Sequence, residues 1–145
     1  MRIIIPVNNQ YAEDFIQWLI KKIKSNILLQ LDLRKLYPVV AYQKEKKIFK
    51  PQANDELPIN FESVVKHVVK SITYKKVKDN WIIYIPQNTP YKGYFTTLYA
   101  LCRFIDKGNS EVKGYPIFSN TFNGVAANIS KYYNQFLKMF VLWGS

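Results

Sequence analysis

The sequence contains one cysteine and one histidine in 145 residues. A lone Cys102 can form neither an internal disulfide nor a thiolate cluster, and a lone His67 cannot build a His-rich zinc site, so we expect no metal and no cofactor. The five glycines are scattered, which excludes a glycine-rich loop of the kind that cradles phosphate groups. Most common catalytic arrangements are therefore absent, and we expect no enzymatic activity and no catalytic residue.

Acidic residues are also scarce, with 10 Asp and Glu in the whole chain. Two adjacent pairs occur, Glu13 with Asp14 and Asp55 with Glu56. Adjacent residues on a helix point in different directions, so these pairs are typical of a helix start and of a solvated loop rather than of acid–base chemistry. His67 has no carboxylate or nucleophile beside it in the sequence, so we expect a structural or surface role for it.

Long hydrophobic runs are missing as well. No uncharged apolar stretch approaches the roughly 20 residues that span a bilayer, and no basic start leads into a cleavage site of small residues. We therefore expect neither a membrane protein nor a secreted precursor. The hydrophobic fraction of 48% is too high for a disordered chain, and the length predicts a single domain over residues 1–145.

Positive charge is what the chain has in excess, with a formal net charge of +11. Such a charge makes nucleic acid a natural neighbour, because lysine–phosphate contacts release counterions. Arginine, however, contributes only Arg2, Arg34 and Arg103 to the 21 basic residues, and Lys, Ile, Asn and Tyr are all abundant. An AT-rich genome would give this bias without selection for binding, so the charge is either functional or compositional.

The spacing of apolar residues predicts the main helices and strands. A helix over residues 10–31 follows from apolar positions three and four apart, and residues 61–71 show the same spacing, although their four valines also suit a strand. Residues 71–77 and 81–85 alternate with a period of two and predict a β-hairpin over about 71–85. We expect Lys78, Asp79 and Asn80 to form a three-residue loop, since Asn tolerates the left-handed conformation.

The remaining segments complete an α+β fold. Residues 2–7 predict a strand that Pro6 places at a sheet edge. Residues 96–107 predict a short helix that ends at Gly108 and buries Cys102 as a small hydrophobe. Residues 116–143 predict one long helix in which Gly124 is the place for a kink. The expected architecture is a small antiparallel sheet with its hairpin, packed by the N-terminal helix (10–31) and the long C-terminal helix (116–143).

Lysines and aromatic residues alternate on the expected hairpin. Trp81 and its neighbours offer the combination of stacking and phosphate contact that single-strand binders use. Lysine in place of arginine indicates binding without sequence readout. The same lysines also suit a solvated edge strand that resists aggregation. The residues expected to contact nucleic acid or a partner are Lys44, Lys46, Lys47, Tyr74, Lys75, Lys76 and Lys78.

Aromatic residues make up 16% of the chain, more than one core of this size readily hides. Tyrosine and tryptophan are enriched at the centres of protein–protein interfaces. Trp143 either packs into its own core or docks on a neighbouring subunit, and the sequence leaves both open. The residues expected at a subunit interface are Trp81, Tyr84, Phe140 and Trp143.

A series of short motifs runs through residues 61–145. In chain order these are a helix leading into Lys70-Ser71-Ile72, a hairpin over residues 72–85, Thr89-Pro90-Tyr91, Arg103-Phe104-Ile105-Asp106-Lys107-Gly108, Tyr115-Pro116-Ile117-Phe118 and a long final helix. This order resembles that of the minor tail or tail-completion (head–tail neck) proteins of tailed bacteriophages.

The resemblance implies a non-enzymatic virion protein that is assembled in the host cytoplasm. Its partners would be further copies of itself, in a ring, and the adjacent portal, neck or tail proteins, with DNA passing through the ring without being read. The alternative from the residues themselves is a small protein that binds nucleic acid non-specifically through its hairpin.

Overall fold

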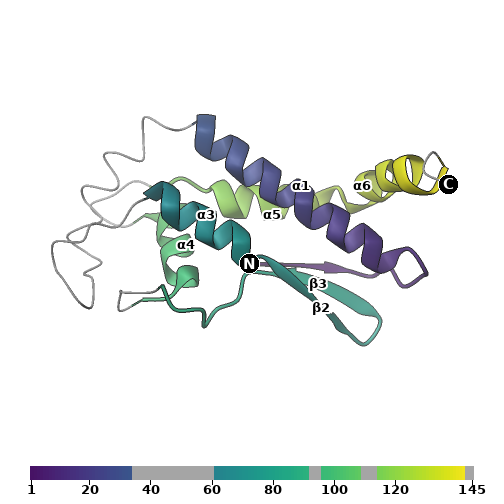
Figure 1. Cartoon of the computed structure of the whole chain (residues 1–145), viewed down its shortest axis with the longest axis horizontal. Coiled ribbons are helices and arrows are strands. Elements are labelled where there is room, and N and C mark those ends of the chain that lie inside the picture. The colour runs from purple at the N-terminus through teal and green to yellow at the C-terminus, as the bar shows by residue number, and fades with distance from the viewer. Residues whose placement is uncertain (34–60, 92–95, 109–113, 143–145) are drawn as a thin grey trace, which may run out of the picture.

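The computed structural model of the chain describes residues 1–33, 61–91, 96–108 and 114–142. Helices cover one side of a small antiparallel sheet, so the expected α+β fold is confirmed (Figure 1). In chain order the elements are β1 (Arg2–Ile5), α1 (Ala12–Leu33), α3 (Phe61–Ser71), β2 (Thr73–Val77), β3 (Asn80–Tyr84), α4 (Leu98–Lys107), α5 (Ile117–Ala127), α6 (Ile129–Phe136) and the π-helical turn η1 (Leu137–Leu142).

The sheet has the strand order β1-β3-β2, with every pair antiparallel. β1 is an edge strand, as Pro6 predicted. Because side chains alternate along each strand, the register divides them into two faces. The inner face, toward α1 and α5, carries Ile3, Ile5, Tyr74, Lys76, Trp81 and Ile83. The outer face carries Arg2, Ile4, Thr73, Lys75, Val77, Asn80, Ile82 and Tyr84.

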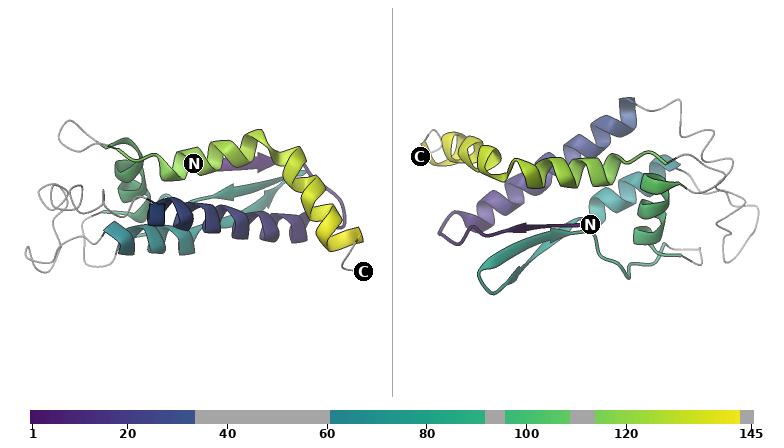
Figure 2. Two further views of the ribbon diagram at one scale, coloured as in Figure 1. Left: turned by 90° about the horizontal axis from the view of Figure 1, so that it is seen from above. Right: turned by 180° about the vertical axis from the view of Figure 1, so that it is seen from behind.

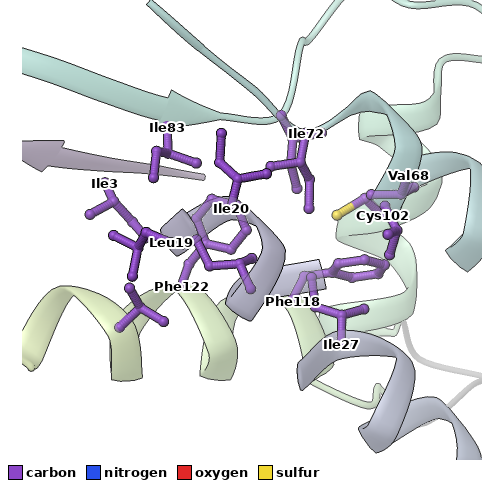
Figure 3. Close-up of a cluster of buried hydrophobic side chains, with 14 of the residues drawn as sticks. Ile3, Leu19, Ile20, Ile27, Val68, Ile72, Ile83, Cys102, Phe118 and Phe122 are labelled. Atoms are coloured by element: carbon purple, nitrogen blue, oxygen red, sulfur yellow. The ribbon is translucent and has the colours of Figure 1, made fainter. Parts of the chain in front are cut away.

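Helix α1 forms because its apolar residues recur at helical spacing and an Asx turn leads into its start. The side chain of Asn9 accepts a hydrogen bond from the backbone N–H of Tyr11 at 2.9 Å, just before the first turn. One side of the helix is fully buried along its length, through Phe15, Ile16, Leu19, Ile23 and Ile27. The prediction of a helix over residues 10–31 is thus confirmed, and Figure 3 shows this side meeting the sheet and α5.

Helices α3 and α4 close one end of the core. The valine-rich segment, which the sequence also allowed as a strand, is a helix. Its helical spacing places Val64, Val65 and Val68 together in the core, where all three are fully buried. The hydroxyl of Thr97 caps α4 by accepting from the N–H of Ala100 at 3.1 Å. Gly108 ends α4 with a φ of 65°, and Cys102 is fully buried among the helices, as expected (Figure 3).

The end of α4 and the start of α5 are in direct contact. The buried Asp106 carboxylate accepts hydrogen bonds from the backbone N–H groups of Phe118 and Ser119, both at 2.9 Å, and so caps the start of α5. A Cβ at Gly114 would lie 2.4 Å from the carbonyl carbon of Lys107, so only glycine fits this crossing. These contacts therefore hold the end of α4 close to the start of α5.

The C-terminal segment differs from the single helix expected over residues 116–143. Helix α5 ends at Ala127, Asn128 takes non-helical φ and ψ of −123° and 27°, and α6 starts in a new direction (Figure 2). The Asn128 side chain donates to the carbonyl oxygen of Gly124 at 2.8 Å, a local bond that competes with helical geometry. The break thus lies at Asn128, while Gly124 stays inside α5.

The hairpin matches its expected place, but its turn is shorter than expected. Val77 pairs with Asn80, which leaves Lys78 and Asp79 as a two-residue loop. A loop of this length needs a positive φ at its first residue, and Lys78 supplies it with a φ of 56°. Asn80, expected in the loop, is the first residue of β3.

Candidate assembly surfaces

The described residues contain no cluster of His, Cys, Asp and Glu that could hold a metal ion. None of the helices in the described ranges is long and apolar enough to cross a membrane. His67 is exposed on α3 and lies 2.7 Å from the carbonyl oxygen of Ser63 through Nδ1. Burial raises the pKa of the Cys102 thiol far above its ordinary value, so this side chain stays a protonated core residue.

The expected contact residues of the hairpin are divided between the two faces of the sheet. On the outer face, Lys75 Nζ lies 4.9 Å from the ring centre of Tyr84. On the inner face, Lys76 Nζ lies 5.5 Å from the ring centre of Trp81. Each lysine thus covers an aromatic ring on its own side. Lys75 and Lys76 therefore form two separate cation–ring pairs, one on each face, and do not form a single basic patch.

Tyr74 and Trp81 belong to the packing between the sheet and α1. Their rings lie 5.8 Å apart, and the Tyr74 hydroxyl donates to Glu13 Oε1 at 3.0 Å. Gln17 Nε2 donates to the same hydroxyl at 3.1 Å. The indole N–H of Trp81 is buried and has no hydrogen-bond partner among the described residues. Both rings are half-buried in this arrangement, which joins β2 and β3 to the start of α1.

The outer face has an apolar centre, which is not among the surfaces expected from the sequence. Ile4 and Ile82 are paired neighbours there, and Ile4 is 51% exposed. Ile82 lines a hollow of about 390 Å³, together with Arg2, Lys75 and Tyr84. The signal was present in the sequence, because RIII and NWII carry aliphatic residues at both alternating positions, where a one-sided strand would alternate with polar ones.

A second apolar surface lies on the C-terminal arm, defined as α6 and η1 (residues 129–142). Phe136 anchors the arm in the core, with its ring centre 5.4 Å from that of Phe15 and 5.8 Å from that of Trp18. One turn further on, Phe140 stacks on Phe136 at 4.9 Å and remains 54% exposed, next to Met139 at 56%. The arm, whose backbone turns away from α5 in Figure 2, therefore carries aromatic contacts from the buried Phe136 to the exposed Phe140.

Of the expected interface residues, Tyr84 lies on the outer face, Trp81 on the inner face and Phe140 on the arm. Trp143 lies outside the described residues, as do Lys44, Lys46 and Lys47. Lys78 lies exposed in the turn of the hairpin.

Comparison with protein-family models, with curated proteins and with solved structures found no match to this chain.

Proposed function

We propose that this chain is a non-enzymatic structural subunit that assembles with other copies of itself. The observation that carries the proposal is the C-terminal arm, where Met139 and Phe140 are exposed directly beyond the buried Phe136. Side chains of this size are costly to leave in water, and aromatic residues and methionine are enriched in interface cores. The exposed ring of Phe140, stacked on the buried Phe136, is therefore suited to contact with a neighbouring subunit.

The setting we propose is a ring in the head–tail neck or tail of a tailed bacteriophage, with adjacent portal, neck or tail proteins as further partners. The support is the order of motifs that resembles this family, together with the structural roles of its residues. Asp106 caps α5, and Gly108 ends α4 with a positive φ. Both residues belong to the motif over residues 103–108, and each has a structural role that favours its residue type.

Non-specific nucleic-acid binding by the hairpin is the alternative, and the geometry gives it less support. Lys75 and Lys76 lie on opposite faces, and the Tyr74 hydroxyl is held by Glu13 and Gln17. A strand of nucleic acid needs cations and free aromatic rings along one surface.

Size-exclusion chromatography with light scattering, at low and high salt and with the 260/280 nm absorbance ratio, tests the proposal. We expect an oligomer that resists salt and carries no nucleic acid. The double variant Met139→Ser/Phe140→Ser should weaken association by tenfold or more, since two exposed apolar contacts are lost, each worth about 1 kcal/mol or more. Leu29→Ser is the matched control, because Leu29 on α1 is 58% exposed and lies outside the arm.

Two results would contradict the proposal. A monomer at both salt concentrations would exclude self-assembly through the arm. A species that carries nucleic acid at low salt and becomes a monomer at high salt would favour the alternative function, since phosphate contacts weaken steeply with salt.

A further inference from the structure

The outer face of the sheet combines an apolar centre with a margin of positive charge. In the central row of the register, Ile82 lies between Ile4 on β1 and Lys75 on β2. In the adjacent row, Tyr84 lies beside Arg2. The two cations thus border the aliphatic pair from different strands, on opposite edges of the sheet.

Negative charge is absent from the strands themselves, since β1, β2 and β3 contain no Asp or Glu. The nearest carboxylate along the chain is that of Asp79 in the turn, and it accepts a hydrogen bond from the side chain of Asn8 at 3.3 Å. Arg2 and Lys75 are exposed, and the described residues place no carboxylate within salt-bridge distance of either. Within the described ranges, the face therefore presents two cations without an ion-pair partner beside apolar side chains.

This combination distinguishes between the classes of partner. Nucleic acid would use free aromatic faces and a line of cations, but the Tyr84 ring is covered by Lys75 and the centre of the face is aliphatic. The same face of a second copy would bring Arg2 and Lys75 against their own equivalents, and like charges oppose such pairing. A protein surface with apolar side chains flanked by carboxylates could pack on the aliphatic centre and form ion pairs with the cations beside it.

We propose that the outer face of the sheet binds a segment of a partner protein in which aliphatic residues are flanked by Asp or Glu. Ile4 and Ile82 provide the apolar contact, and Lys75 and Arg2 pair with the carboxylates. This inference rests on the proposed role as a structural subunit and specifies the chemistry of a second partner, which binds at a place separate from the C-terminal arm.

The test is a selection from a display library of random dodecapeptides on the full chain, followed by affinity measurements on variants. Lys75→Glu reverses a charge on the outer face, while Lys76→Glu makes the same change one residue away on the inner face. Both lysines are exposed and each lies over an aromatic ring, so the variants are closely matched. Ile4→Thr tests the apolar centre with a residue that also suits a strand.

We expect selected peptides to be enriched in Asp and Glu next to Ile, Leu or Val. Their affinity should fall about tenfold or more with Lys75→Glu, fall with Ile4→Thr, and change little with Lys76→Glu. Equal losses with both lysine variants, peptides without acidic residues, or no peptide that depends on Lys75 would overturn the inference. Displacement of the peptides by a DNA oligonucleotide at moderate salt would assign the face to nucleic acid instead.

The two proposals fail separately. If no peptide depends on Lys75 while the oligomer still depends on Met139 and Phe140, the outer-face inference is wrong and the assembly proposal stands. If peptides depend on Lys75 but the chain is monomeric, the outer face binds a partner without self-assembly. The arm variant Met139→Ser/Phe140→Ser should leave peptide affinity unchanged, because the arm and the outer face share no residue.

Discussion

The two faces of the small sheet carry similar aliphatic and aromatic side chains, but helices cover the inner face and none of the described helices covers the outer one. On β3, Ile83 is fully buried against the helices, whereas its neighbour Ile82 is partly exposed on the outer face. Both are isoleucines in the same central strand, so residue type does not distinguish them. What distinguishes them is that α1 and α5 cover the inner face, while none of the described helices packs on the outer one (Figure 1).

The polar residues repeat this contrast. Tyr74, on the inner face, makes two hydrogen bonds to α1 through its hydroxyl. Tyr84, on the outer face, interacts with the cation of Lys75 through its ring. Side chains of the inner face therefore pack against the helices, while those of the outer face contact none of the described helices, and matched substitutions on the two faces can test this division.

The largest expected difference is between Ile83→Ala and Ile82→Ala. Removing the buried Ile83 side chain should lower the free energy of unfolding by about 3 kcal/mol, because apolar contacts are lost and a cavity remains. Ile82→Ala should cost less than about 1 kcal/mol, since Ile82 is partly exposed and no described helix packs on it. Chemical denaturation followed by circular dichroism measures both, and equal costs would show that the outer face is covered as well.

A second prediction concerns the buried carboxylate on the helical side of the molecule. Asp106→Asn should destabilise the protein by about 1–2 kcal/mol, because an amide offers one acceptor oxygen to two backbone N–H donors. Asp79→Asn, in the exposed turn, is the control and should change stability by less than about 0.5 kcal/mol.

The pH dependence of Asp106 has a definite sign. Burial raises the pKa of its carboxyl in the folded state, against the opposing effect of the bonds from Phe118 and Ser119. A folded-state pKa above the unfolded one stabilises the protein fully below the unfolded pKa, and this contribution is lost as pH rises through the folded pKa. The stability difference between the wild type and Asp106→Asn should therefore shrink as pH rises from acid toward neutral. A difference that grows with pH would contradict this assignment.

The sequence was sufficient to predict those helices and strands whose own pattern of apolar and polar residues determines their structure. Helices α1 and α3 have apolar residues on one side, and the hairpin alternates around polar loop residues, so burial and local geometry favour the same result. The end of α4 at Gly108 was likewise visible, because glycine adopts the positive φ that a helix end needs.

What the sequence could not provide depends on contacts between distant segments. Asp106 caps a helix that starts 11 residues later in the chain, and nothing local marks it as a cap. The break at Asn128 arises from a side-chain bond to Gly124 and from the packing of Phe136 on α1, which helical spacing alone does not reveal. Likewise, Ile4 and Ile82 are known to be on an uncovered face only once the helices are placed.

A third prediction compares the two tyrosines. Tyr74→Phe removes the hydroxyl that bonds Glu13 and Gln17 and should lower the free energy of unfolding by about 1 kcal/mol. Tyr84→Phe should leave stability within about 0.5 kcal/mol, since its ring and the contact with Lys75 are retained. Thermal unfolding of the pair measures the difference, and a larger loss for Tyr84→Phe would reverse the roles assigned to the two faces.

The smallest expected effect on stability concerns the hairpin turn, which decides the face of the sheet on which each side chain of β2 and β3 lies. The two-residue loop sets the register of β2 and β3, and a shift by one residue would exchange inner and outer side chains. Lys78 holds a positive φ of 56°, which costs free energy in any residue with a Cβ. Lys78→Gly should therefore stabilise the protein by about 0.5–1 kcal/mol. Lys78→Ala is the control, because it removes the same charge and keeps the Cβ; equal stability of the two variants would mean that backbone strain in this turn does not limit the hairpin.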